Sequence, residues 1–327
     1  TDSLYGRRSL YALSDSHFDP LDIEIFESTS FKLKHNQFVE LLGRFEFSNT
    51  KYYQKLNDLL GGDYFIDYGK FVTSNYNKNP NIQNVNHIVR VGDVYAFDYS
   101  IHSTKFSLQQ AYSAKFRKID FNLGLQEEIV WINLFRNYQN LIFINSNPQV
   151  INNGQNGLNG KFNLGAKSNI VYKRNGRNYF ELGTALHRIN PSSDQIYINP
   201  AWRYDILPVN DQTQIGKIDL SYKYKSPEFR LALTGFYYQF NHQIKSRNFY
   251  LDASAEEQIG SDLLDGGFVN GFYTGLNEVH RGIEASVSWD VNSVLQINVV
   301  GQKGEYYYSS RPTYYYYDQF SPSSGNK

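Results

Sequence analysis

Apolar and polar residues alternate with a period of two along most of the chain, and the 3.6-residue period of an amphipathic helix is hard to find. The clearest run begins after Glu278. One of its faces carries Val279, Ile283, Ala285, Val287 and Trp289, with Arg281 as the single polar exception. The other face carries His280, Gly282, Glu284, Ser286, Ser288 and Asp290. This pattern predicts a β-strand with one mainly apolar and one mainly polar face.

The same alternation predicts five β-hairpins, and therefore ten antiparallel strands. They comprise residues 31–33 with 39–47, 106–116 with 119–125, 162–172 with 180–186, 218–224 with 229–237, and 279–289 with 295–301. The third hairpin turns at Asn175-Gly176, and Asn-Gly between two alternating runs is the strongest short-range signal for a hairpin. The sequence therefore predicts an all-β, antiparallel fold.

The predicted connections alternate in length. Turns within hairpins are short, whereas long connections are expected over residues 50–105, 132–160, 188–216 and 246–278. Because antiparallel neighbours reverse direction, all short turns fall at one end of the sheet and all long loops at the other. This asymmetry is typical of outer-membrane barrels, with short periplasmic turns and long extracellular loops. The alternation of apolar and polar residues would also fit a soluble β-sandwich, which is the alternative fold. A sandwich, however, carries loops at both ends.

Strand length and composition favour the membrane barrel. The longest runs match or exceed the ~9–11 residues that cross a bilayer at a tilt. Glycines lie inside strands, where the core of a sandwich would lose packing, at positions 43, 165, 183, 235 and 301. Tyrosines gather near strand ends, as in an interfacial girdle, at positions 222, 224, 237, 238 and 306–308. The mean hydropathy is −0.53 and no run of 18 apolar residues exists, so the sequence offers no transmembrane helix.

Charge and cysteine content remove several functional classes. Lys plus Arg and Asp plus Glu both number 32, and this balance argues against nucleic acid as a partner. The absence of Cys removes disulfide scaffolds, thiolate metal sites and cysteine nucleophiles. No nucleophile–base pair stands at a readable spacing, so we expect neither an enzyme nor a cofactor site. A calcium site around Glu256, Glu257, Asp262 and Asp265 lacks the spacing of a dedicated calcium loop.

Four short motifs resemble a known family. They are NDLLGGDYFIDYGKF at residues 57–71, GDVYAFDY at 92–99, RGIEASVSW at 281–289 and YYYSSRPTY at 306–314. In this order, and among these hairpins and loops, they resemble the barrel of TonB-dependent outer-membrane receptors of the Bacteroidetes type. The resemblance runs from about Phe31 to Pro312.

The resemblance implies energised nutrient uptake across the bacterial outer membrane. In that family a barrel of about 22 strands surrounds an N-terminal plug, the TonB complex pulls on a Ton box, and several members work with a surface lipoprotein that lids the barrel. This sequence shows no plug, no Ton box and no C-terminal strand that ends in an aromatic residue. We therefore expect residues 1–327 to be part of one barrel domain. The expected partners are outer-membrane lipid and, through the parent protein, the plug and the TonB complex.

The loop residues indicate the kind of ligand. Asn-rich stretches at residues 75–86 and 145–163 accompany aromatic residues at positions 52, 53, 64, 65, 68 and 314–317. Amides bond hydroxyl groups and rings cover apolar faces, which suits an oligosaccharide or a peptide better than an anionic siderophore. The residues expected to contact the ligand are Tyr64, Phe65, Tyr68, Tyr314, Tyr315 and Tyr316. The alternative function is a soluble or surface-attached β-sheet module for glycan binding or adhesion.

Overall fold

One large antiparallel sheet accounts for most of the chain. The computed structural model describes residues 6–68, 79–139, 141–144, 147–150, 156–202, 206–251, 267–318 and 324–326. Ten long strands pair in five hairpins, which confirms the predicted all-β, antiparallel fold. These strands are β1 (Leu13–Lys34), β2 (Gln37–Asp58), β5 (Val94–Lys115), β6 (Ile119–Arg136), β9 (Asn156–Lys173), β10 (Asn178–Ile189), β11 (Thr213–Lys225), β12 (Phe229–Leu251), β13 (Gly267–Asp290) and β14 (Gln296–Tyr308).

Each long strand pairs with its neighbour in sequence, so the strand order follows the chain from β1 to β14. The tight turns form where the sequence predicts them. The side chain of Asn175 accepts hydrogen bonds from the backbone N–H groups of Arg177 and Asn178, at 2.9 and 2.8 Å. The Phe229 N–H likewise donates to the hydroxyl of Ser226 at 3.0 Å. Side chains that bond nearby backbone in this way stabilise short turns.

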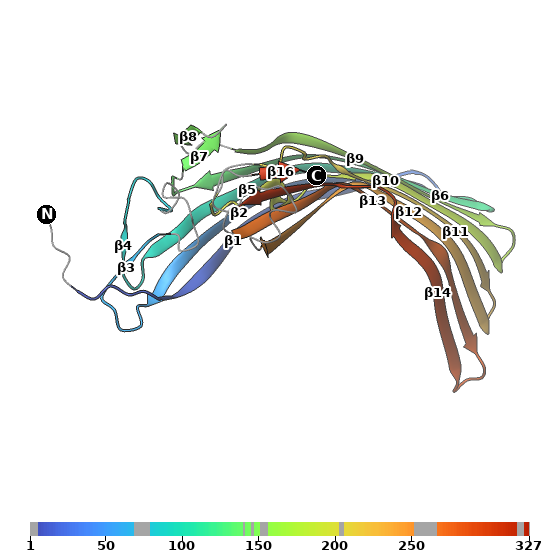
Figure 1. The fold of residues 1–327 in the computed structure, drawn as a ribbon. Coiled ribbons are helices and arrows are strands. Elements are labelled where there is room, and N and C mark those ends of the chain that lie inside the picture. The colour runs from blue at the N-terminus through green and yellow to red at the C-terminus, as the bar shows by residue number, and fades with distance from the viewer. Residues whose placement is uncertain are drawn as a thin grey trace.

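Smaller elements lie beyond the ends of the long strands. They are β3 (Phe65–Ile66), β4 (Ile88–Val89), β7 (Leu141–Ile144), β8 (Asn147–Val150), β15 (Thr313–Asp318), β16 (Ser324–Asn326) and the short helix α1 (Ser193–Ile196). Figure 1 shows β3, β4, β7 and β8 at the left and the short hairpin turns at the right, as the alternating connections predict. Among the described residues, no helix is long and apolar enough to span a bilayer.

Several strands extend beyond their predicted ends. The expected loop over residues 50–105 is much shorter, because β2 continues to Asp58 and β5 already begins at Val94. Tyr52 and Tyr53 therefore lie in a strand and not in a loop. Similarly, β12 continues to Leu251 and β13 begins at Gly267. The alternation of apolar and polar residues fades in these extensions, but the backbone ladder continues because pairing does not depend on side-chain polarity.

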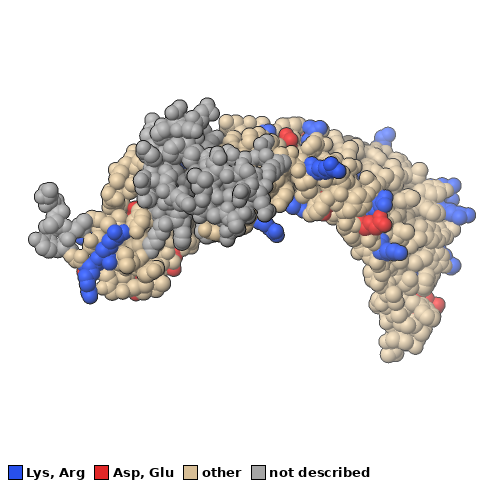
Figure 2. All heavy atoms as spheres, viewed as in Figure 1, with Lys and Arg blue, Asp and Glu red and all other residues tan. Residues whose placement is uncertain are grey.

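The register places the alternating apolar residues of the five predicted hairpins on one face. One row across the sheet joins Ile25, Phe45, Phe106, Ile129 and Phe162. Another row joins Leu182, Leu220, Gly235 and Ile283. Many of these large apolar side chains are exposed; Ile283, for example, is 57% exposed. We call this surface the apolar face. Figure 2 shows Lys and Arg side chains gathered toward the short-turn end of the sheet, at the right.

The opposite surface, the polar face, carries linked charged side chains. Arg44 contacts Glu24 at 3.2 Å and Glu46 at 3.4 Å, and the ammonium group of Lys105 reaches Glu46 at 2.7 Å. Farther along the sheet Lys173 pairs with Asp120 at 2.7 Å, and Lys223 pairs with Glu181. His280 belongs to this face by register, as the sequence predicts, and so does His187. The predicted separation of the two faces is thus confirmed.

The tyrosine girdle is only partly as predicted. Tyr222, Tyr224, Tyr237 and Tyr307 lie on the apolar face by register. Tyr306 and Tyr308 alternate with Tyr307 along β14 and therefore lie on the polar face. Tyr238 also lies on the polar face, because it pairs with His280. A run of three tyrosines in a strand cannot all face one side, because successive side chains point in opposite directions.

Candidate functional site

The segment between β10 and β11 folds over the polar face at the long-loop end of the sheet. The side chains of Ile196 and Tyr197 are buried against Tyr99, Val130, Ile132, Leu134 and Leu158. The amide of Gln195 donates to the backbone oxygen of Ile244 at 2.6 Å, on β12. The guanidinium of Arg136 donates to the backbone oxygen of Ala201 at 2.7 Å, on the β6 side. This inward-folded segment, residues 193–202, therefore bonds to strands from both halves of the sheet.

The start of α1 is set by local capping. The backbone N–H of Ser192 donates to the side chain of Gln195 at 3.0 Å, and the Ser192 and Gln195 side chains form a reciprocal capping box. The helix ends after one turn, and Tyr197 is already extended. The single turn points Ile196, which is fully buried, at the sheet.

A cavity of about 450 Å³ lies between the inward-folded segment and the sheet. Its walls come from four long strands and from the segment. They include Tyr52 on β2, Tyr99 and Ile101 on β5, Asp194, Asn199 and Trp202 on the segment, Ser246 and Asn248 on β12, and Asn270 and Phe272 on β13. Rings and side-chain amides dominate, and Asp194 is the only charged side chain among the described residues that line the cavity.

The shared cavity shows that the sheet curves around its polar face. In the strand order, β2 and β13 stand seven steps apart. On a flat sheet seven steps would separate them by about 34 Å. A cavity of about 450 Å³ cannot reach that far, so the polar face must be concave. Figure 1 shows that the sheet is arched and not flat. Because the polar face is concave at the cavity, the apolar face forms the convex side.

The aromatic residues of the cavity are held in fixed positions. The rings of Tyr52 and Tyr99 stack with centroids 4.8 Å apart. Burial raises the pKa of both hydroxyl groups, and the nearby carboxylate of Asp194 raises the pKa of Tyr52 further. Both tyrosines therefore remain neutral hydrogen-bonding groups at physiological pH. The site can cover apolar ring faces and exchange hydrogen bonds with hydroxyl or amide groups.

Tyr64, Phe65 and Tyr68 lie together in the loop between β2 and β5, and not at the cavity. Phe65 is buried in a cluster with Leu56, Leu59, Val89 and Tyr95. The backbone oxygen of Tyr64 accepts a hydrogen bond from the Ser9 N–H at 2.7 Å. The guanidinium of Arg8 lies 5.1 Å from the ring centre of Tyr68. This loop is thus packed against the N-terminal segment.

Tyr314, Tyr315 and Tyr316 form part of β15, which pairs with the long-loop end of β13. Tyr316 is buried beside Val269, and the ring of Tyr314 lies 4.8 Å from that of Tyr273. Tyr315 packs against a cluster that contains Ile198 and Phe272, so β15 supports the cavity from behind. The structure does not bring this group together with Tyr64, Phe65 and Tyr68, which belong to a different cluster.

Sequence patterns did not identify most of the cavity residues. Tyr99, Trp202, Asn248 and Asn270 come from segments far apart in the sequence, and no motif connects them. The one local signal was Asn199-Pro200, which is typical of a turn. The calcium candidate at residues 256–265 lies outside the described residues. Among the described residues, no group of three or more His, Cys, Asp or Glu side chains is placed to hold a metal ion.

Comparison with known proteins gives low-identity likenesses only. No family model and no curated protein sequence matches the chain. A crystal structure of the ferric-catecholate import receptor Fiu from E. coli K12 aligns at 8% identity and a TM-score of 0.47, over 96% of this chain and 44% of that one. The structure of the FpvAI–pyocin S2 complex aligns at 11% identity and a TM-score of 0.47, over 94% of this chain and 37% of that one.

The copper transporter OprC aligns at 7% identity and a TM-score of 0.37, over 92% of this chain and 56% of that one. The chain thus spans less than half the length of the first two proteins and little more than half of the third.

Proposed function

We propose that this chain is part of the barrel wall of a TonB-dependent outer-membrane receptor, in which the concave polar face lines the lumen and the convex apolar face meets lipid. The observation that carries the proposal is the exposed apolar face of a curved sheet whose hollow side is polar. Water-soluble sheets bury their apolar face, whereas barrels in lipid turn it outward. The separation of short turns from long loops supports the same assignment.

The rest of such a receptor would complete the sheet. The edges of β1 and β14 have no further partner among the described strands, and unpaired backbone groups are not stable in hydrocarbon. We infer that further strands close the barrel, and that a plug domain and the TonB complex act on it through the parent protein. Energised import is then a property of the whole receptor and not of this chain alone.

We further propose that the imported ligand is an oligosaccharide or a peptide. The cavity under the inward-folded segment offers rings and amides, and its one charged lining residue among those described is the acidic Asp194. A highly anionic ferric siderophore would be repelled by Asp194 and would find no Lys or Arg among the described lining residues. Tyr64, Tyr68, Tyr314 and Tyr315 remain proposed ligand contacts at the loop surface, where an incoming ligand arrives first.

The membrane assignment is tested with spin labels at Ile283 and Glu284 in the parent protein. These neighbours point to opposite faces of β13, so the label at 283 should be quenched by a lipid-soluble agent and the label at 284 by a water-soluble one. Equal access of both agents at both positions would contradict the barrel. It would favour the soluble glycan-binding module instead.

The ligand class is tested by uptake assays in a strain that carries Trp202→Ala. We expect reduced oligosaccharide or peptide uptake, because stacking on an aromatic ring contributes about 0.5–1.5 kcal/mol and therefore up to about tenfold in affinity. Trp289→Ala removes the same side chain from the apolar face near the short turns and should leave uptake unchanged. Loss of ferric-siderophore uptake on gene deletion, with glycan and peptide use intact, would overturn the ligand assignment.

A further inference from the structure

Two basic side chains, Arg281 and Lys303, interrupt the apolar face at one place. Arg281 lies beside Glu305 and Tyr237 in one row of the sheet, and Lys303 lies beside Ile283 in the adjacent row. Arg281 donates through Nε and Nη2 to one oxygen of Glu305, at 2.9 and 2.7 Å. Lys303 takes part in no ion pair within the described part of the chain. The group therefore keeps one net positive charge.

An apolar groove of about 580 Å³ runs beside these charges. Ile218, Leu220, Tyr237 and Ile283 form its apolar lining, and the side chains of Arg281, Lys303 and Glu305 line it as well. Its floor lies over Gly235, where a methyl group would have no neighbour within 4 Å. The missing side chain leaves a notch between larger apolar residues. Toward the short-turn end the same face continues through Ala285 and Gly301, which are paired with each other. Both residues are small, so no large side chain interrupts the face between the groove and the next row.

The charges lie at the long-loop border of the apolar face and not in its middle. Arg281 stands eight positions from Trp289, which is near the short-turn end of β13. At ~3.4 Å per residue and a tilt of about 40°, eight residues rise about 21 Å along the membrane normal, close to the ~25 Å height of an apolar band. The groove thus has the row of Arg281 nearer the membrane surface, and the face that continues through Ala285 and Gly301 leads toward the bilayer centre. A lipid of the leaflet on the long-loop side is oriented in the same way, with its headgroup at the membrane surface and its acyl chains toward the bilayer centre.

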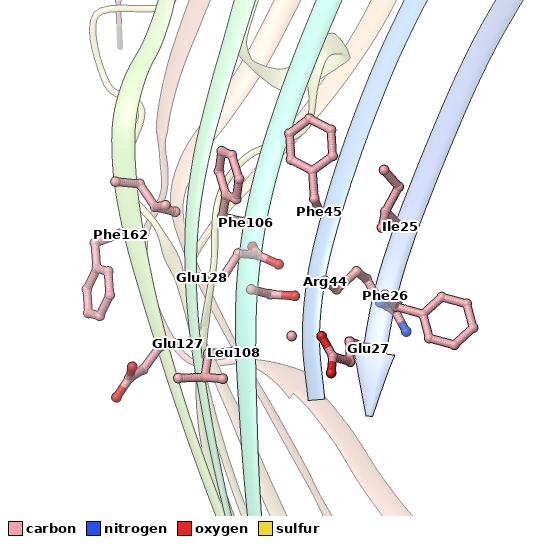
Figure 3. A pocket seen from close by; sticks show the side chains of 13 residues that line it. Ile25, Phe26, Glu27, Arg44, Phe45, Phe106, Leu108, Glu127, Glu128 and Phe162 are labelled. Carbon is pink, nitrogen blue, oxygen red and sulfur yellow. The ribbon is translucent and has the colours of Figure 1, made fainter. Parts of the chain in front are cut away.

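A second groove on the same face provides an internal comparison. It has a volume of about 620 Å³ and lies over Gly43, where an added methyl group would likewise meet nothing within 4 Å. Figure 3 shows Phe45, Phe106 and Phe162 around it, with Glu27, Leu108 and Glu127 in the next row. The one basic residue that lines it, Arg44, belongs to the polar face and is bound there by Glu24 and Glu46. The two grooves are therefore similar in volume and each lies over a glycine, but they differ in charge.

We propose that the groove at Arg281 and Lys303 binds the phosphate group of an anionic lipid, with an acyl chain along Ile283 and Gly235. The Lys303 ammonium group is the main phosphate ligand. Glu305 holds the Arg281 guanidinium in place, and the remaining N–H groups of that guanidinium are available to a second phosphate oxygen. The groove over Gly43 does not bind such a lipid, because Glu27 and Glu127 repel a phosphate. This inference rests on the membrane location proposed above.

The test uses the membrane-extracted parent protein in nanodiscs of phosphatidylcholine with a minor fraction of phosphatidylglycerol or of lipid A. A photo-crosslinking residue replaces either Leu220 in the first groove or Leu108 in the second. We expect enrichment of the anionic lipid at 220 and none at 108. Lys303→Gln should reduce capture at 220 about tenfold, as expected for loss of a charge-assisted hydrogen bond. Inorganic phosphate should compete weakly, since it lacks the acyl chain.

Lys217→Gln is the matched control, because Lys217 lies on the polar face, with its ammonium group 5.4 Å from the ring centre of Tyr238. It should leave lipid capture unchanged. Equal capture of phosphatidylcholine and anionic lipid at 220, or an undiminished signal in Lys303→Gln, would overturn the inference while the barrel assignment stands. Absence of any lipid capture at both 220 and 108 would instead overturn the membrane location itself.

Discussion

The carboxylate of Asp67 is a buried titratable group in the loop between β2 and β5, with 4% of its side chain exposed. It accepts a hydrogen bond from the Ala96 N–H at 3.0 Å, and the ring of His87 lies 4.0 Å away. Burial raises its pKa from 3.8 to about 6, and these two contacts only partly oppose the rise. The folded loop therefore encloses a carboxyl group, that of Asp67, whose neutral form is favoured by burial.

We expect the stability of this loop to fall as the pH rises from about 4 to about 6 and to level off above. The folded pKa lies above the unfolded value, so the folded loop binds the proton more tightly and loses that advantage as the pH rises through the window. A pKa difference of this size corresponds to at most about 3 kcal/mol. The pH dependence of the loop's stability can be measured by hydrogen exchange of the Ala96 N–H over this pH range. Asp67→Asn should abolish the slope and His87→Gln should retain it; an unchanged slope in Asp67→Asn would contradict this account.

At the scale of the element, two glycines of the same sheet differ in what surrounds them. A methyl group on Gly282 would lie 2.4 Å from the backbone oxygen of Lys303 and 2.8 Å from the ring of Phe236. On Gly235 it would meet nothing within 4 Å. The β13–β14 pairing therefore needs a glycine at 282, whereas position 235 tolerates a side chain.

We predict that Gly282→Val lowers the free energy of unfolding by about 3 kcal/mol or prevents β13 and β14 from pairing, because the clash is with backbone atoms that cannot move aside. Gly235→Val should leave folding intact, since valine favours strands and the space is open. Denaturant unfolding of the membrane-extracted protein compares the two. Equal destabilisation by the two substitutions would show that the cost comes from placing valine in a strand, and not from the close contact between Gly282 and β14.

At the scale of the whole molecule, the inward-folded segment connects distant parts of the arch. Ile196 is fully buried on the β5–β6 side, while Gln195 bonds to β12. Because these contacts come from both sides of the hollow, the segment and the cavity depend on the curvature of the entire sheet.

We predict that Ile196→Ala releases the segment, since removing a fully buried isoleucine costs about 2–5 kcal/mol. The expected result is faster protease cleavage within residues 190–207 together with weaker uptake of the ligand. Ile189→Ala is the control, because Ile189 is 42% exposed on β10. If both variants were cleaved at the wild-type rate, the segment would not depend on its contacts with the sheet.

The sequence alone determined the strands and their two faces. In a strand successive side chains point to opposite sides, so the alternation around Ile283 and Glu284 was enough to assign each residue to a face. The same local rule placed the five short turns, and turn residues such as Asn175 and Ser226 confirm them. The alternation rule did not predict that β2 extends past Tyr52, because the alternation fades there while backbone pairing continues.

Only the tertiary structure decided where the candidate site lies. Tyr52, Tyr99, Asn248 and Asn270 meet around one cavity because the sheet curves and the segment around α1 folds into the hollow. Curvature arises from the accumulated twist and coiling of many paired strands, so no local pattern specifies which distant residues it brings together. The aromatic loop residues chosen from composition, such as Phe65 and Tyr316, proved to be buried in separate clusters for the same reason. Local alternation determines which way a side chain points, and the curvature of the whole sheet determines what it meets.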